Sequence, residues 1–217
     1  MNILAIGAHI GDTELMAGPY LCQLAMDGAS CFMLALTSGE KGNPEVEPNK
    51  YKQQKLEEAS EFSKKSGIPY EVYADIPDAH LFGSEMLVQR VINTIKNKEI
   101  TQVITHWRGS FHPDHRQAHD IVSQAVLRIN LQLKGENQIS IRFCENWEDV
   151  EGFTIDEYAE ISESAVKKWK ESIEHEEFIY GDFSKFRYFN YYQALLTIRG
   201  CLSGNDFAVA FKNEKLL

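Results

Sequence analysis

Short apolar runs alternate with longer amphipathic or charged stretches along the first part of the chain. The apolar runs have the length and bulk of strands buried on both faces, and they cover Asn2–Gly7, Cys31–Thr37, Pro69–Ile76 and Gln102–Trp107. Helices are expected after them, over Pro19–Gly28, Lys50–Ser66, Glu85–Asn97 and His115–Ile129. Because parallel strands need crossover connections, this alternation predicts an α/β fold whose mostly parallel sheet carries helices on both faces.

Two clusters of ionisable residues follow strand ends. His9 and Asp12 come directly after the first predicted strand, and the sequence HPDH, residues 112–115, comes shortly after the fourth. The carboxyl ends of parallel strands share one edge of the sheet, and ligands bind along that edge. We therefore expect the two clusters to meet there.

The chain from about residue 139 onward no longer alternates in this way. It contains one more strand-like segment (SIRFCE), an acidic loop and at least two helices. With 217 residues, the chain is long enough for one sizeable core and too short to demand two. We expect a single domain over residues 1–217, in which this last part is a cap or an extension of the sheet.

Composition excludes several classes of partner. The 32 acidic and 22 basic side chains give a formal charge of −10, which repels nucleic acid and anionic lipid surfaces. No stretch approaches the roughly 20 apolar residues of a membrane span, and the first apolar run lacks the features of a secretory signal. These observations predict a soluble, cytoplasmic protein with no nucleic-acid or membrane partner. The cysteines form no CxxC pair and are expected to be buried, reduced thiols: Cys22, Cys31, Cys144 and Cys201.

The two ionisable clusters have the residue types of a metal site. An imidazole and a carboxylate three residues apart on a tight turn can face one ion, and HPDH supplies a distant histidine. Three protein ligands with an open position for water are typical of catalytic zinc. Asp114 can orient a histidine ring through its second nitrogen. A nucleotide site is not favoured, because the turn after the first strand contains neither GxGxxG nor GK[ST].

The other ionisable residues considered are not expected to belong to the site. The remaining histidines are expected to be hydrogen-bonded core or surface residues: His80, His106, His119 and His175. The charged residues of the second predicted helix are expected on a solvated face: Lys55, Glu57 and Glu58.

The sequences AHIGDTEL and HPDH together resemble the LmbE-like (PIG-L) zinc-dependent N-deacetylases. This family removes acetyl groups from N-acetylglucosaminyl compounds, including those of bacterial thiol biosynthesis. Supporting similarity extends over most of the chain, through LTSGEKG, LEEASEFSKKSGI, ENWED and RGCLSGNDFAVAF. The resemblance implies a Rossmann-like, three-layer α/β/α sandwich, and the tendency of such proteins to assemble implies a homo-oligomer.

The resemblance also assigns roles to individual residues. It implies that His9, Asp12 and His115 are the zinc ligands. His112 falls on the histidine that stabilises the oxyanion or protonates the leaving amine, and Asp114 falls on the carboxylate that holds this histidine and keeps it cationic.

Three further positions have less definite roles. Glu14 matches a family glutamate that we expect to support the turn or the ligands, and it stays among the catalytic candidates. Trp147 of ENWED can stack on a sugar ring or simply pack. The loop LTSGEKG is either a glycine-rich connection or part of the substrate pocket.

One catalytic position differs from the family pattern. The aspartate that serves the family as general base falls on Gly11. The leading hypothesis is a hydrolase in which zinc-bound water removes an acetyl group from an N-acetylglucosaminyl-type small molecule, either slowly or on an altered substrate. The alternative is a metal- and sugar-binding protein without turnover. Two histidines and one aspartate suit zinc first, with iron, manganese or cobalt as substitutes.

Overall fold

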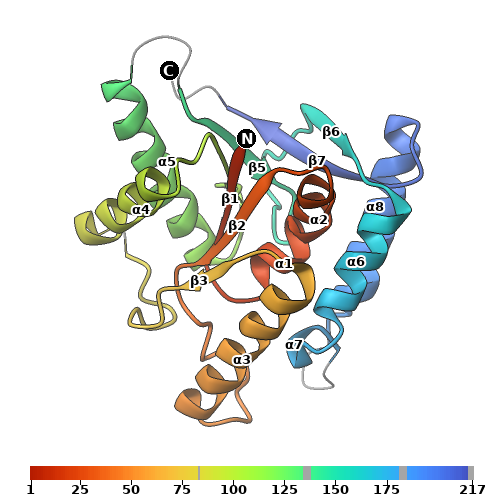
Figure 1. Ribbon diagram of the computed structural model, residues 1–217. Helices are drawn as coiled ribbons and strands as arrows, with labels where there is room; N and C mark the ends of the chain where they lie inside the picture. Colours follow the sequence, from red (N-terminus) through yellow and green to blue (C-terminus); the bar gives the residue numbers. More distant parts are fainter. Residues whose placement is uncertain (83, 134–137, 181–184, 215–217) are drawn as a thin grey trace.

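A computed structural model describes residues 1–82, 84–133, 138–180 and 185–214 of the chain (Figure 1). Within these ranges, a seven-stranded sheet runs in the order β3-β2-β1-β4-β5-β7-β6. The strands are β1 (Asn2–Gly7), β2 (Ser30–Ala35), β3 (Tyr70–Val72), β4 (Gln102–His106), β5 (Ser140–Cys144), β6 (Glu157–Glu160) and β7 (Ala208–Asn213). The strands from β3 to β5 are parallel, whereas β7 is antiparallel to both β5 and β6. The predicted α/β class with a mostly parallel sheet is confirmed.

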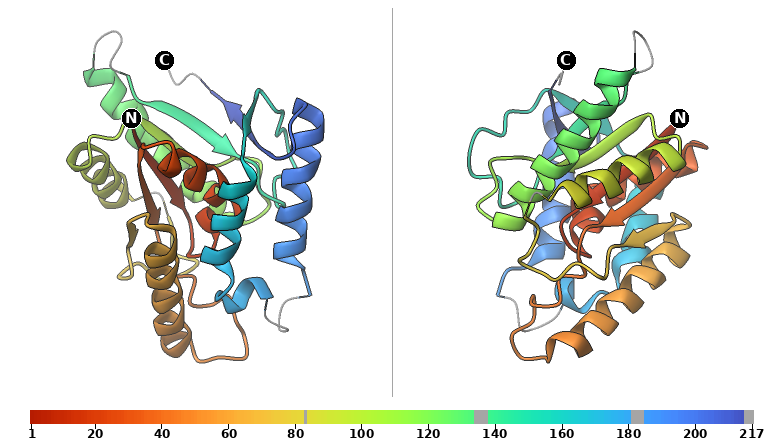
Figure 2. Two further views of the ribbon diagram at one scale, coloured as in Figure 1. Left: turned by 45° about the vertical axis from the view of Figure 1, so that its right-hand side comes forward. Right: turned by 90° about the vertical axis from the view of Figure 1, so that its left-hand side faces the viewer.

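Helices cover both faces of this sheet (Figure 2). They are α1 (Asp12–Met16), α2 (Gly18–Met26), α3 (Pro48–Ser66), α4 (Glu85–Asn97), α5 (Pro113–Gln132), α6 (Glu163–Ile173), α7 (Glu177–Tyr180) and α8 (Tyr188–Ser203). Helices α4 and α5 pack on one face through a core that includes Val91 and Ile121. On the other face, α2, α6 and α8 contribute Leu21, Trp169 and Leu196 to a second core. The sheet therefore separates two apolar layers, as the alternating pattern predicts.

Several predicted elements need correction. The strand expected over Pro69–Ile76 is only the three residues of β3, and the short helix α1 was not expected. Strands β6 and β7 were also missed. The side chains of β6 are half-buried or exposed in alternation, so this edge strand lacks the apolar run that marks the central strands. Of the four cysteines, Cys201 is exposed.

The final part of the chain extends the sheet and covers one face of it. β5 continues the parallel order next to β4, and β7 and β6 complete that edge. Helix α6 packs against α2 and α3. Among the helices of the described ranges, none combines the length and the apolar character that crossing a membrane requires.

Candidate active site

A cavity of about 680 Å³ lies at the carboxyl ends of the parallel strands. Each of these strands is followed by residues that line it: His9 and Asp12 after β1, Gly39 and Lys41 after β2, Asp78 after β3, His112 to His115 after β4, and Trp147 and Glu148 after β5. Since β1 and β4 are neighbours in the sheet, the turns that follow them meet. Gly39, Lys41 and Gly42 of the loop LTSGEKG form part of the cavity wall, and the cavity lies along the edge at which the sequence places the two ionisable clusters.

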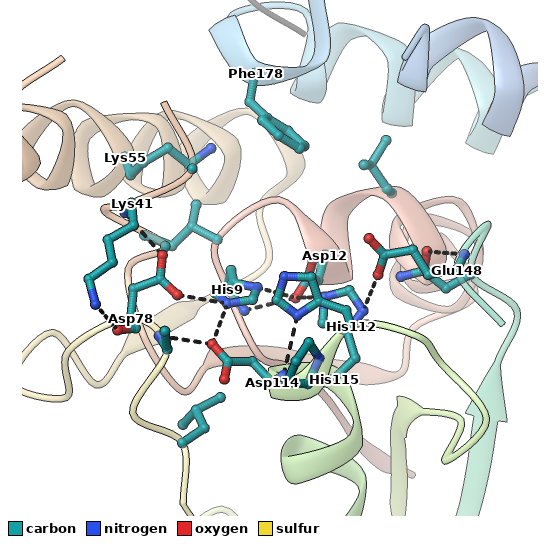
Figure 3. Close-up of a pocket in the computed structure, with 18 of the residues that line it drawn as sticks. His9, Asp12, Lys41, Lys55, Asp78, His112, Asp114, His115, Glu148 and Phe178 are labelled. Atoms are coloured by element: carbon teal, nitrogen blue, oxygen red, sulfur yellow. Dashed lines mark hydrogen bonds and ion pairs between the residues drawn. The ribbon is translucent and has the colours of Figure 1, made fainter. Parts of the chain in front are cut away.

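Three predicted metal ligands come together on the floor of this cavity. His9, Asp12 and His115 offer ligand atoms that all lie within 4.8 Å of one another. Asp12 Oδ2 is 3.3 Å from His9 Nδ1 and 3.4 Å from His115 Nε2. Ligand atoms of a tetrahedral zinc ion lie about 3.3 to 3.4 Å apart, given bonds of about 2.0 to 2.1 Å. The donor types and their spacing therefore fit zinc. Figure 3 shows these side chains gathered below Lys55 and Phe178.

Two glycines make this arrangement possible. Gly11 has φ 108°, a conformation that L side chains rarely adopt, and it turns the chain from β1 into α1. The turn lets Asp12 Oδ2 accept a hydrogen bond from the main-chain N–H of His9 at 2.8 Å. Gly39 also has positive φ, and a Cβ there would lie 3.1 Å from His9 Cβ. The β2 loop can therefore approach the His9 side chain closely.

The electrostatics of the cluster follow from burial and opposite charge. Burial alone would raise the pKa of Asp12, but His115 and His9 hold it well below its usual range. Burial would likewise lower the pKa of His115, but Asp12 and Glu148 raise it to about 9. The pKa of His9 is raised well above its ordinary value against the effect of burial, mainly by Asp12 and Asp114. Positive charge is thus strongly favoured beside Asp12.

Three residues that lie against the predicted ligands were not assigned to the site from the sequence, although His106 is, as expected, a buried hydrogen-bonded histidine whose Nε2 accepts from Ala8 N at 3.1 Å. His106 ends β4, its Nε2 lies 3.2 Å from Asp12 Oδ2, and its ring stacks on His115 with centroids 4.0 Å apart. Burial and the neighbouring His115 lower its pKa to about 4. Asp78 Oδ1 lies 3.2 Å from His9 Nε2, and Glu148 Oε2 lies 2.6 Å from His115 Nδ1. All three lie at strand ends or in the segments that follow them. The expectation that ligands bind at the carboxyl ends of parallel strands, which led to His9, could therefore have identified them as well.

The expected contact between Asp114 and His112 needs correction. Asp114 Oδ2 lies 3.2 Å from His9 Nε2 and accepts a hydrogen bond from Ala79 N at 2.9 Å. Only the main-chain N–H of Asp114 reaches His112, with Nδ1 accepting it at 3.3 Å. Burial and the nearby His115 and His9 lower the pKa of His112. His112 is therefore not held cationic by a carboxylate, because the Asp114 carboxylate faces another histidine.

Glu14 is not among the described residues that line the cavity. It belongs to a second buried polar cluster, whose members are Thr13, Glu14, Lys55, Glu58, Tyr70 and Glu176. Its carboxylate accepts hydrogen bonds from Thr13 at 2.9 Å and Tyr70 at 3.0 Å, and Trp169 Nε1 donates to its main-chain oxygen at 2.7 Å. Burial raises the pKa of Glu14 to about 7. These contacts favour a supporting role in the turn over a direct catalytic role.

Lys55 and Glu58 also belong to this second cluster, so their predicted solvated position is wrong. Lys55 Nζ lies 2.7 Å from Glu58 Oε2 and 3.9 Å from Glu176 Oε2. The Lys55 side chain is only 2% exposed, yet it also lines the cavity. If Gly11 had a Cβ, it would lie 3.8 Å from Lys55 Nζ and 3.7 Å from Glu176 Oε2. The space beside Gly11 is therefore bounded by a buried ion pair.

Comparison with known proteins gives one family and several similar folds. The family model described as GlcNAc-PI de-N-acetylase (PIG-L) matches residues 4–126. A conserved protein of Thermus thermophilus has 21% identity and a TM-score of 0.81, with 99% of this chain and 95% of that chain covered. The 4-carboxy-2-hydroxymuconate hydratase GalB of Pseudomonas putida has 19% identity and a TM-score of 0.81, with coverage of 99% and 96%. The N,N'-diacetylchitobiose deacetylase of Pyrococcus horikoshii has 15% identity and a TM-score of 0.80, with coverage of 99% and 84%. At these identities the three structures establish the fold.

Proposed function

Because the chain belongs to the GlcNAc-PI de-N-acetylase (PIG-L) family, we propose that it is a metal-dependent hydrolase that removes an acetyl group from an N-acetylglucosaminyl-type small molecule. The observation that carries this proposal is the donor set of His9, Asp12 and His115 on the floor of a large cavity, with His112 beside it. Three ligands from the protein leave a coordination position for substrate or water. The deacetylase among the similar folds is consistent with this chemistry.

In amide hydrolysis, three residues of the chain would hold the metal and His112 would act on the substrate. A zinc ion held by His9, Asp12 and His115 would supply Lewis acidity, which polarises an amide carbonyl and makes water a nucleophile near neutral pH. His112 lines the cavity, and its ring stacks on His115 with centroids 4.5 Å apart. Its Nδ1 accepts a hydrogen bond from Asp114 N, so the Nε2–H of the neutral ring is available to donate a hydrogen bond to the amide oxygen as negative charge develops.

Gly11 sets the expected rate of this reaction. A positioned general base typically contributes about 10² to 10⁴ in rate, and position 11 has no side chain to provide one. We therefore expect a slow enzyme, or one whose substrate differs from that of its relatives. Glu14 is not a replacement in this arrangement, because it is fully buried and is not among the described residues that line the cavity.

The cavity supports a small glycan-like substrate that carries an N-acetyl group. Its volume of about 680 Å³ lies in the range of about 300 to 1,000 Å³ that is typical of small-molecule sites. Trp147 lines it and stacks on Phe186 with centroids 4.2 Å apart, so packing against Phe186 occupies part of its surface. A cytoplasmic location, a homo-oligomeric state and a single domain over residues 1–217 remain predictions from the sequence.

The alternative function is a metal- and sugar-binding protein without turnover, and Gly11 is the observation that favours it. An assay of the zinc-loaded protein with N-acetylglucosaminyl compounds separates the two by measuring released amine. We expect amine release by the wild type that is lost in His112→Ala. Calorimetric binding of the same compounds without amine release would establish the binding protein instead. Because the fold also occurs in a hydratase, water addition to an unsaturated carboxylic acid serves as a third arm of the assay.

A further inference from the structure

Glu148 and His115 form a buried contact that neither the family match nor the sequence motifs assign. Glu148 Oε2 lies 2.6 Å from His115 Nδ1, and the two side chains are 8% and 5% exposed. Neither atom forms a hydrogen bond of regular geometry with any group in the described part of the chain. An unpartnered polar atom is costly to bury. The short contact between the two atoms is therefore the interaction through which each of them can be satisfied.

The contact occurs at the nitrogen of His115 that faces away from the other metal ligands. His115 Nε2 faces Asp12 Oδ2 at 3.4 Å, whereas Nδ1 faces Glu148. A histidine that binds a metal through one nitrogen commonly donates its other N–H to a carboxylate, which fixes both the tautomer and the ring orientation. Among the described residues, Glu148 belongs neither to the donor group of His9, Asp12 and His115 nor to the second possible group, which is His9, His112 and Asp114. Its position therefore suits an outer partner of His115 and not a ligand.

The main chain around Glu148 is held in place from two directions. Its N–H donates to Asn146 Oδ1 at 3.4 Å, and its carbonyl accepts from Phe111 N at 3.0 Å. Asn146 Oδ1 also accepts from the Tyr192 hydroxyl at 2.9 Å. The side chain extends from this segment toward His112 and His115 (Figure 3). The carboxylate is thus presented by a fixed backbone, as a positioning group must be.

From this geometry we infer that Glu148 is a positioning residue, which accepts the Nδ1–H of His115 and so keeps Nε2 directed at the metal beside Asp12. His9 receives the corresponding support from Asp114 and Asp78, which face its Nε2 at 3.2 Å each. Both histidine ligands therefore have a carboxylate on the nitrogen opposite the metal. The inference rests on the proposed metal centre and assigns the segment ENWED a role in maintaining it.

The test compares Glu148→Ala and Glu148→Gln with the wild type and with Glu145→Gln. Glu145 is a matched control, because it is a largely buried glutamate of the same segment whose partner, Arg199, lies outside the cavity. Zinc affinity is measured by competition with a chromophoric chelator, and the absorption spectrum of the cobalt-substituted protein reports ligand geometry. Removing an outer carboxylate typically costs about 10- to 100-fold in metal affinity or activity. We expect a loss of zinc affinity in this range for Glu148→Ala, a smaller loss for Glu148→Gln, whose amide oxygen can still accept the N–H, and none for Glu145→Gln.

A nitrogen-detected NMR spectrum of the zinc-loaded protein adds a direct readout of the His115 tautomer. The Nδ1–H form is expected in the wild type and a mixture of ring states in Glu148→Ala, with folding of every variant checked by circular dichroism. The inference would be overturned if both Glu148 variants kept the zinc affinity, the cobalt spectrum and the His115 tautomer of the wild type. This holds even if turnover fell, because a fall in turnover alone would make Glu148 a catalytic group. If the wild type binds zinc but releases no amine, only the proposed function fails. If the wild type binds no metal, the metal centre itself is wrong.

Discussion

Asp12 Oδ2 lies 3.4 Å from His115 Nε2, although Asp12 begins α1 near the start of the chain and His115 lies on α5. Their approach depends on the pairing of β1 with β4, which brings the turns after these strands together. The contact is the structural basis of the proposed metal centre, because it joins the two sequence motifs at one point. The consequences can be tested residue by residue.

Replacing a ligand histidine is expected to remove the metal. His9→Ala or His115→Ala leaves two of three protein ligands, so the purified protein should hold less than about a tenth of the wild-type zinc under dilute chelator, in line with the strong dependence of affinity on ligand number. Metal content measured by atomic emission checks this. His80→Ala is the control, because His80 is exposed and its ring nitrogen Nδ1 lies 3.0 Å from a main-chain oxygen, that of Asp78. Equal zinc content in all three variants would contradict the ligand assignment.

His112→Ala is expected to separate metal binding from turnover. In the proposed centre the metal is held by His9, Asp12 and His115, so zinc content should stay at the wild-type level; a loss of zinc would instead point to the second possible donor group, His9, His112 and Asp114. Amine release should fall by about 10² to 10³, because the hydrogen-bond donor to the developing negative charge is lost. Steady-state rates per bound zinc provide the measurement. Unchanged rates would mean that His112 has no catalytic part.

Gly11→Asp is expected to destabilise the protein without restoring a strong general base. The φ of 108° at this position disfavours any residue with a Cβ, so the free energy of unfolding should fall by about 1 to 3 kcal/mol. The Cβ of the new aspartate would lie 3.8 Å from Lys55 Nζ and 3.7 Å from Glu176 Oε2, so its carboxylate would compete with Glu176 for Lys55 instead of being free to act as a base. Urea unfolding and amine release test both parts. A rise in rate of about 10² or more would show that the missing aspartate alone limits the enzyme.

Lys55→Met is expected to destabilise the protein strongly. The substitution keeps much of the side-chain volume but leaves Glu58 and Glu176 buried without their cation. Breaking a buried pair in this way costs about 3 to 5 kcal/mol. Lys64→Met is the control, because Lys64 is 76% exposed and its pairing with Glu61 is a surface contact that is worth at most about 1 kcal/mol. Similar free energies of unfolding for the two variants would mean that the cluster is not held by charge.

Asp149 should make stability fall as pH rises. Burial raises the pKa of Asp149 from 3.8 to about 7, so between these values the folded protein binds more protons than the unfolded chain. Its contribution to stability is complete below about pH 4 and is lost as pH rises through about 7. Asp149→Asn removes this dependence and can keep the hydrogen bond from Asn146 N. Urea unfolding of the metal-free protein at several pH values should therefore show a smaller fall for the variant than for the wild type.

Local pattern determined much of the fold. The buried strands β1, β2 and β4 and the helices α3, α4 and α5 lie close to their predicted ranges, because apolar runs and helix-terminating residues act over short distances. The sequence also placed His9, Asp12 and the HPDH residues at one edge of the sheet, since parallel strands share their carboxyl ends. The antiparallel edge of β7 and β6 was not predicted. β7 has a buried apolar run at 208–211, but its direction and the half-exposed β6 depend on pairing with β5 and with each other.

Tertiary structure decided which partner each ionisable side chain has. From sequence, Asp114 was expected on His112, but the approach of Ala79 and His9 turns its carboxylate toward His9. Lys55 looks solvated along its helix, but Glu176 and Phe178, which lie far along the chain, contact its ammonium group in the buried cluster. Residue types and strand order thus determined that a metal site could form. Which nitrogen of each histidine faces Asp12, and which carboxylate lies against the other nitrogen, depend on contacts between segments far apart in the chain, whose distances no local pattern contains.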